Sequence, residues 1–284
     1  MSFDRRLTLM RDGVATTALE GVAPASRYLD PTPMQVSAPA APLRRHPDDG
    51  AEQESQLLFG ERFDVLLEEG GWSFGQSARD GYVGWLASEA LSGPHIPPTH
   101  RIRVLRTYGF SRPDIKSPPT GLYSLNAMVC VAEAEGRFSR VERGGWIISD
   151  HLAPVGMNLE ADPAAVALQF LGAPYLWGGR ESLGLDCSAL VQQTLTACGV
   201  ACPRDTDMQA KTGLAIAREQ LERNDLVFWK GHVAMMLDAT RMIHANAHHM
   251  MVAIEPLAEA LVRIEAAGSG PPTAFRRVWR VHRV

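Results

Sequence analysis

The chain contains 284 residues, of which 45% are apolar and 21% are charged, and its formal net charge at pH 7 is −4. This length predicts more than one compact domain, and a mildly acidic chain without a basic run is not typical of nucleic-acid binding. Charges are spread through the first twenty residues, and no stretch approaches the roughly 20 apolar residues of a membrane span. We therefore expect a cytoplasmic protein with neither a nucleic-acid partner nor a membrane partner.

The N-terminal half begins with a segment that lacks periodicity and continues with short strands. Residues 22–50 are rich in proline and alanine, which indicates an extended lead-in before the first stable core. The sequence RFDVLLEEGGWSFGQSARDGYVGWL at 62–86 predicts three strands separated by a Gly-Gly turn and an Arg-Asp-Gly turn. This pattern indicates a small all-β domain, barrel-like if it closes.

A weaker copy of the same pattern follows at 126–152, where strand, Gly turn, strand, Gly-Gly turn and a Trp-led strand recur. A Pro-rich connector at 92–100 separates the two copies, and 111–120 reads as a long loop inside the second. Two related β modules in tandem are therefore expected. The predicted segments are a lead-in at 1–40, a first β domain at 41–93, a second at 100–156 and a C-terminal domain at 157–284.

The C-terminal domain has a mixed pattern. Asp162 before Pro163 is a helix-start signal, and a second helix is expected from Cys187 to Gly199. Helices followed by antiparallel strands indicate an α+β fold. The remaining predicted elements are strands at 225–229, 232–238, 241–247 and 275–281 and a short helix at 256–264.

Cys187 lies where a Gly-rich loop gives way to an apolar helix, directly after Asp186. A thiol attacks as its thiolate, and the unpaired backbone N–H groups of a helix N-terminus favour that anion. Asp is a preferred N-cap residue, so the first turn is expected to begin at the thiol. A structural core cysteine is the alternative for this residue taken alone.

Cysteine catalysis on amides also needs a histidine that takes the thiol proton and later protonates the leaving amine. His232 opens an apolar strand after a glycine, and His244 on the next strand can orient its ring. A two-residue turn at 239–240 would place the two rings on opposite faces, whereas a three-residue turn or one bulge places them on one face. We predict the same face, with the two residues as diagonal neighbours.

No metal or other cofactor is expected. Four cysteines are too few and too irregularly spaced for a disulfide framework, and Cys198 and Cys202 lack a second pair with zinc-like spacing. His244 and His248 on one strand would lie about 13 Å apart, which is too far to chelate one ion.

The segments PYLWGGRESLGLDCSALVQ, GHVAMMLD and IHANA together resemble the NlpC-like cell-wall cysteine peptidases, whose pattern is Tyr-x-Trp-Gly-Gly, Asp-Cys-Ser-Gly, Gly-His-Val and a second His. PRDTDMQ after the helix is similar more loosely. Ala189 stands where the family usually has the last Gly of Asp-Cys-Ser-Gly. The resemblance implies a papain-like topology, with the cysteine on a helix and the histidines on strands.

Roles follow from the resemblance position by position. It implies Cys187 as nucleophile, His232 as base, His244 as the orienting residue and Tyr175 as a donor to the oxyanion. Trp177 flanks the cleft in the family, where packing and substrate contact are equal alternatives. The implied substrate-site residues are Asp186, Ser188, Arg204 and Thr206.

The paired β modules resemble the bacterial SH3-like domains that precede such peptidases. In relatives of this architecture, the first module closes one end of the cleft, and a tyrosine and an acid there receive the free amino terminus of a short peptide. The sequence RDGYVGWL places Tyr82 and Asp80 in the matching stretch. Both residues also suit ordinary turn and packing roles.

The expected function is that of a cysteine endopeptidase that hydrolyses the γ-D-glutamyl to diamino acid bond of peptidoglycan-derived peptides. A cytoplasmic enzyme would meet free peptides with an N-terminal L-Ala, which suits murein recycling. One alternative is a cell-wall peptide binding module whose catalytic domain no longer turns over. Another is acyl transfer by the same thiol. The diamino acid accepted and the oligomeric state stay open.

Overall fold

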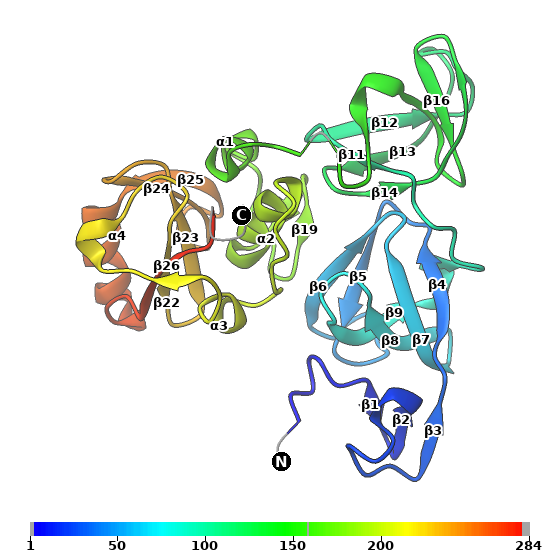
Figure 1. Ribbon diagram of the computed structural model, residues 1–284, viewed down its shortest axis with the longest axis horizontal. Helices are drawn as coiled ribbons and strands as arrows, with labels where there is room; N and C mark the ends of the chain where they lie inside the picture. The colour runs from blue at the N-terminus through cyan, green and yellow to red at the C-terminus, as the bar shows by residue number, and fades with distance from the viewer. Residues whose placement is uncertain (1–2, 158, 280–284) are drawn as a thin grey trace. The chain divides into compact units, whose positions relative to one another are not determined.

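The computed structural model describes residues 3–157 and 159–279. The chain divides into two compact units, Met1–Val155 and Gly156–Val284 (Figure 1). Strands dominate the first unit, whereas the second combines helices with one large sheet. Among the described residues, no helix is both long enough and apolar enough to cross a membrane.

The first part of unit 1 contains a small sheet in the order β1-β2-β3 and a seven-stranded sheet in the order β10-β4-β7-β8-β9-β5-β6. Buried side chains such as Val36, Phe63 and Leu86 form its core. The strands are β1 (Met10–Arg11), β2 (Val14–Thr16), β3 (Arg27–Leu29), β4 (Thr32–Val36), β5 (Ala40–Arg44), β6 (Gln53–Leu58), β7 (Arg62–Glu69), β8 (Trp72–Ser77), β9 (Val83–Ala87) and β10 (Leu91–Ser92).

The prediction of an extended lead-in at 22–50 is wrong, because β4 and β5 belong to the seven-stranded sheet. The lead-in domain assigned to 1–40 therefore already contains part of that sheet. Proline explains the error. Pro33 pairs only with β7 and Pro42 only with β6, so each proline lies where its strand has a partner on one side. A missing N–H is tolerated at such edge-like positions.

The predicted repeat of strands and turns is confirmed. It also extends to strands that precede the predicted stretches, namely β5 in the first copy and β12 in the second. Arg44 of β5 pairs with Trp85 of β9, and Phe110 of β12 pairs with Trp146 of β17, so the two tryptophan-bearing strands have matching partners. The strands of the second copy are β11 (His100–Ile102), β12 (Arg106–Phe110), β13 (Pro119–Ser124), β14 (Met128–Val129), β15 (Val131–Glu135), β16 (Phe138–Val141), β17 (Gly145–Ile148) and β18 (Leu152–Pro154). They form sheets in the orders β14-β11-β18 and β13-β12-β17-β16-β15.

Unit 2 is built on a six-stranded sheet in the order β21-β26-β22-β23-β24-β25. Helix α2 packs against β23 and β24, while α4 contributes Leu257 and Ile264 to a core cluster that includes Met236 and Met242 of the sheet. The helices are α1 (Pro163–Gln169), α2 (Cys187–Ala197), α3 (Thr206–Gln209) and α4 (Leu257–Ile264). The strands are β19 (Arg180–Glu181), β20 (Gly184–Leu185), β21 (Leu214–Ala215), β22 (Leu226–Trp229), β23 (His232–Met236), β24 (Arg241–Asn246), β25 (Met251–Pro256) and β26 (Ala274–Arg277).

Both predicted helix starts are confirmed, because the side chain of Asp162 accepts from the N–H of Ala164 and α2 begins at Cys187. The strand predicted at 275–281 is β26, which ends at Arg277; residues 280–281 of that prediction lie outside the described residues. Strand β25 was not predicted from the sequence.

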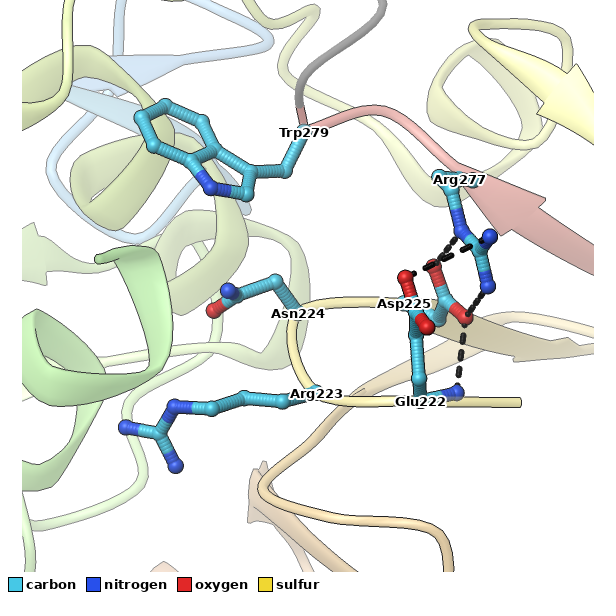
Figure 2. Close-up of a pocket in the computed structure, with 6 residues that line it drawn as sticks. All are labelled: Glu222, Arg223, Asn224, Asp225, Arg277 and Trp279. Atoms are coloured by element: carbon cyan, nitrogen blue, oxygen red, sulfur yellow. Dashed lines mark hydrogen bonds and ion pairs between the residues drawn. The ribbon is translucent and has the colours of Figure 1, made fainter. Parts of the chain in front are cut away.

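An arginine clamp holds the entrance of β22 against β26. Arg277 donates to both carboxylate oxygens of Asp225 at 2.8 Å, and the N–H of Glu222 donates to the same carboxylate at 2.8 Å (Figure 2). These residues line a hollow of about 210 Å³ together with Arg223, Asn224 and Trp279. The clamp lies directly before β22, the strand that precedes His232.

Candidate active site

The nucleophile candidate sits at the first residue of α2. Asp186 is the N-cap, and its Oδ1 accepts from the N–H of Ala189 at 2.8 Å. Cys187 is only 6% exposed, and the backbone N–H groups of Val233 and Ser188 are hydrogen-bonded to its sulfur. Because Val233 follows His232 in β23, the start of the helix and the start of the histidine strand meet at the thiol.

Burial is the main influence on the protonation of the Cys187 thiol. Burial raises the pKa of Cys187 to about 12, and the nearby Asp186 carboxylate acts in the same direction. The N–H groups of Val233 and Ser188 and the guanidinium of Arg204 oppose this increase without cancelling it. The helix N-terminus therefore does not by itself produce a thiolate, in contrast to the expectation from sequence. A base is therefore needed to take the proton of this thiol.

The predicted placement of the two histidines on one face is confirmed. Met236 pairs with Met242, and both histidines lie an even number of residues from this pair. The N–H of Leu237 donates to the carbonyl of Arg241 at 2.8 Å, which leaves a three-residue turn at 238–240. His232 Nε2 and His244 Nδ1 are 2.9 Å apart, a hydrogen-bond distance.

Both imidazoles are held neutral. The ring of His232 lies between Trp229 and His244, with ring centroids 5.8 Å and 5.1 Å away. Burial lowers the pKa of His232 to about 4 and that of His244 to about 3; Arg263 lowers both, and Glu255 partly opposes this. A neutral His232 has a lone pair available for the thiol proton, which a general base requires.

Glu255 on β25 is a site residue that the sequence analysis missed. Its Oε2 lies 3.1 Å from Nε2 of His244, and it is 8% exposed. Arg263 of α4 donates to both of its oxygens, from Nε at 2.9 Å and from Nη2 at 2.6 Å. The signal available in the sequence was the alternating stretch MVAIEP, but no motif marks its glutamate.

The predicted substrate residues Asp186, Ser188 and Arg204 form a buried cluster beneath the thiol. Arg204 donates to both oxygens of Asp186, at 3.0 Å and 2.6 Å, and to Oγ of Ser188 at 2.8 Å. The three residues are between 1% and 6% exposed. The structure thus brings them together, and their contact with substrate stays a prediction.

The other predicted residues of unit 2 surround the same region. Tyr175 is partly buried, and its pKa is raised, first by burial and also by the carboxylate of Asp186, so its hydroxyl keeps the proton that an oxyanion donor needs. Trp177 is 58% exposed, and Thr206 begins α3 with an intermediate exposure.

Tyr82 and Asp80 lie in unit 1, where they have local roles. Tyr82 is 3% exposed and packs in the first core cluster, while Asp80 Oδ1 accepts from the N–H of Tyr82 at 3.2 Å. These contacts are those of an ordinary turn and an ordinary core residue. Their predicted part in binding a peptide amino terminus stays a prediction.

A hollow of about 380 Å³ opens beside His232. Arg263 of α4 and Asn246 of β24 line it, together with Ala247, His248, Ile264, Ala267 and Ser269. The hollow thus adjoins the side chain that is predicted to act as the base.

One group of residues in this region has atoms of the metal-ligand type. His244, His249 and Glu255 offer such atoms within 4.8 Å of one another, whereas His248, the histidine considered from sequence, is not among them. Arg263 occupies both oxygens of Glu255, and its cation opposes a divalent ion there. We assign no metal to this group.

Two family models match the chain. The model described as the NlpC/P60 family matches residues 172–266, and that described as the bacterial dipeptidyl-peptidase Sh3 domain matches residues 43–91. The first match spans α2, the strands β23 and β24 that carry the two histidines, and all of α4, and the second lies within the first β module.

Relatives of known name cover most of the chain. A gamma-D-glutamyl-L-lysine dipeptidyl-peptidase of Bacillus subtilis is 28% identical over 75% of this chain and 78% of its own length. Dipeptidyl-peptidase 6 of Lysinibacillus sphaericus is 26% identical over 74% of this chain and 86% of its own length. The crystal structure of an NlpC/P60 family protein from Bacillus cereus superposes with a TM-score of 0.74 at 21% identity, covering 87% of this chain and 99% of that one, which shows a shared fold.

Proposed function

Because the chain belongs to the NlpC/P60 family of cysteine peptidases and carries an N-terminal bacterial SH3 domain, we propose that it hydrolyses the γ-D-glutamyl to diamino acid bond of peptidoglycan-derived peptides. The observation that carries the proposal is that Cys187, at the start of α2, receives a hydrogen bond from the N–H of Val233, which follows His232 of the hydrogen-bonded histidine pair. The names of the relatives support the γ-D-glutamyl linkage.

The reaction proceeds in two halves. Cys187 gives its proton to Nδ1 of His232 as the sulfur attacks the γ-carbonyl carbon, and the oxyanion receives hydrogen bonds from the Cys187 N–H and Tyr175. The imidazolium of His232 then protonates the departing amine of the diamino acid, which leaves a thioester. Water, deprotonated by His232, attacks the thioester and releases the acyl product and the thiol.

The hollow beside His232 supports this direction of departure. The leaving amine must lie within reach of the histidine that protonates it, so the diamino acid faces the hollow lined by Arg263 and Asn246. A guanidinium there suits a leaving amino acid that carries a carboxylate. The buried cluster of Asp186, Ser188 and Arg204 then belongs to the acyl side.

We further propose that the substrates are free peptides with an N-terminal L-Ala, met in the cytoplasm during murein recycling. The dipeptidyl-peptidase names of two relatives support an enzyme that recognises a free amino terminus.

The proposed fold consists of a papain-like catalytic unit and two SH3-like barrels. The first barrel is proposed to bind the amino terminus of the peptide through Tyr82 and Asp80. The matching strand partners of the two modules support their relationship.

The test is mass-spectrometric. Wild type and Cys187→Ala are incubated with L-Ala-γ-D-Glu-diaminopimelate, with and without an N-acetyl group. We expect wild type alone to release diaminopimelate, and to prefer the unacetylated peptide. Equal rates on both peptides would remove the amine-reading role. Release from purified sacculi instead would shift the substrate to intact wall, and a new amide formed with an added amine would indicate acyl transfer.

A further inference from the structure

Three titratable residues form a diagonal row across three neighbouring strands, on the face of the sheet where α4 packs. His232 lies on β23, His244 on β24 and Glu255 on β25. His244 pairs with Ala253, two residues before Glu255, so His244 and Glu255 are diagonal neighbours in the same sense as the two histidines. The distances along the row are 2.9 Å and 3.1 Å.

The carboxylate at the end of the row has only acceptors to offer. Its Oε2 lies 3.1 Å from Nε2 of His244 without the alignment of a hydrogen bond, but its negative charge favours a hydrogen on that nitrogen, which in a neutral ring leaves a lone pair on Nδ1. That lone pair accepts the hydrogen from Nε2 of His232. In a neutral His232 the remaining nitrogen, Nδ1, is then the unprotonated one. The carboxylate of Glu255 thus favours, in both rings, the tautomer that carries its hydrogen on Nε2.

We propose that Glu255 is a positioning residue that sets the tautomers of His244 and His232, so that Nδ1 of His232 is free to take the thiol proton. The inference rests on the proposed function for its catalytic consequence, but the tautomers themselves can be observed without substrate. In the row, Glu255 contacts His244, and its effect on the tautomer of His232 passes through that ring.

Arg263 completes the arrangement in two ways. Its two hydrogen bonds orient the carboxylate toward His244, and its charge offsets that of Glu255. The charged and titratable groups that act on the pair of rings are Glu255 on β25, Arg263 on α4 and His249 after β24. With the charge of Glu255 offset, the row selects a tautomer and does not hold an imidazolium at rest, which agrees with two neutral histidines.

The first test replaces Glu255 by Gln and records ¹⁵N NMR spectra of histidine-labelled protein at pH 7. An amide can donate to Nε2 of His244, which reverses the row and puts the hydrogen of His232 on Nδ1. We expect this exchange of tautomers and a loss of at least tenfold in kcat, with KM changed less than twofold; replacing the carboxylate of a Ser-His-Asp triad by an amide costs about 10⁴-fold. Glu259→Gln, on the exposed side of α4, is the matched control and should match wild type in both measurements.

Two more variants keep the inference testable. In a His244→Asn background, the further change Glu255→Gln should have almost no effect on kcat, because the link is already cut. Arg263→Gln, which also serves if Glu255→Gln fails to fold, should keep the tautomers and shift the acid limb of the kcat profile to higher pH. Unchanged tautomers and kcat in Glu255→Gln, or an additive double variant, would overturn the inference. Absent turnover in wild type with the expected tautomers would instead refute the proposed function.

Discussion

Two carboxylates, each held by an arginine, stand on either side of the thiol and histidine pair. Asp186 on the helix side receives five hydrogen bonds, from Arg204 twice, Ser188, Ala189 and Gly178. Glu255 on the strand side receives two from Arg263 and also faces His244. The hydrogen bonds of Asp186 hold the start of α2, whereas Glu255 also contacts His244, which is hydrogen-bonded to His232. The comparison teaches that similar ion pairs can have structural and positioning roles within one site.

The largest effect on activity is expected at Cys187. Cys187→Ala should abolish release of diaminopimelate, because no other group can form the thioester, while the stability changes by about 1 kcal/mol or less. Product release is followed by mass spectrometry and unfolding by urea titration. Cys198→Ala, a buried cysteine at the end of the same helix, is the matched control and should keep full activity. Activity in the Cys187 variant would remove the covalent mechanism.

The buried ion pair of Arg204 with Asp186 should have the largest effect on stability. Arg204→Met leaves the buried carboxylate of Asp186 without its cation, and losing one partner of a buried pair costs about 3–5 kcal/mol in the free energy of unfolding. Urea denaturation at pH 7 measures it. Arg223→Met, which breaks a half-exposed pair with Asp162, should cost less than about 1 kcal/mol. An equal loss in the free energy of unfolding for the two variants would contradict a special role for the buried ion pair of Arg204 with Asp186.

A change at His244 should have a smaller effect, which is confined to kcat. His244→Asn retains an amide oxygen that can accept from Nε2 of His232, as in Cys-His-Asn sites, so kcat should fall by about tenfold with little change in KM. Steady-state kinetics on the free tripeptide measure both constants. Complete loss of turnover in a folded variant would mean that His244 takes part in the proton transfer itself.

The histidines should also make stability depend on pH. Their pKa values lie at about 4 and 3 in the folded protein against 6.5 without the fold, so the unfolded chain binds more protons between these values. Their contribution is complete above pH 6.5, and stability should fall as the pH drops from 6.5 toward 4. Urea midpoints across this range measure the slope, which should be shallower in His244→Asn. An equal slope in both proteins would contradict a buried neutral His244.

The smallest effect is expected at Tyr82, which belongs to unit 1. Tyr82→Phe should raise KM for the unacetylated tripeptide by about threefold, the equivalent of one net hydrogen bond, without changing KM for the acetylated peptide. An equal KM for wild type and variant on the unacetylated tripeptide would leave Tyr82 with its packing role in the first core cluster alone.

Much of the site was predictable because its determinants are local. The N-cap Asp186 sets where α2 begins, and the length of the turn at 238–240 decides the face on which His232 and His244 lie. Both depend on a few consecutive residues, whose hydrogen bonds and side-chain period of two can be worked out from the chain alone.

Tertiary structure decided the rest. β4 was missed because its proline suits a strand only where one neighbour is absent, which depends on residues far along the chain. Glu255 was missed because its meaning comes from pairing with β24 and from Arg263 on α4. The neutral resting state of Cys187 and His232 likewise depends on burial. Desolvation is produced by packing from many segments at once, so no local pattern in the sequence can encode it.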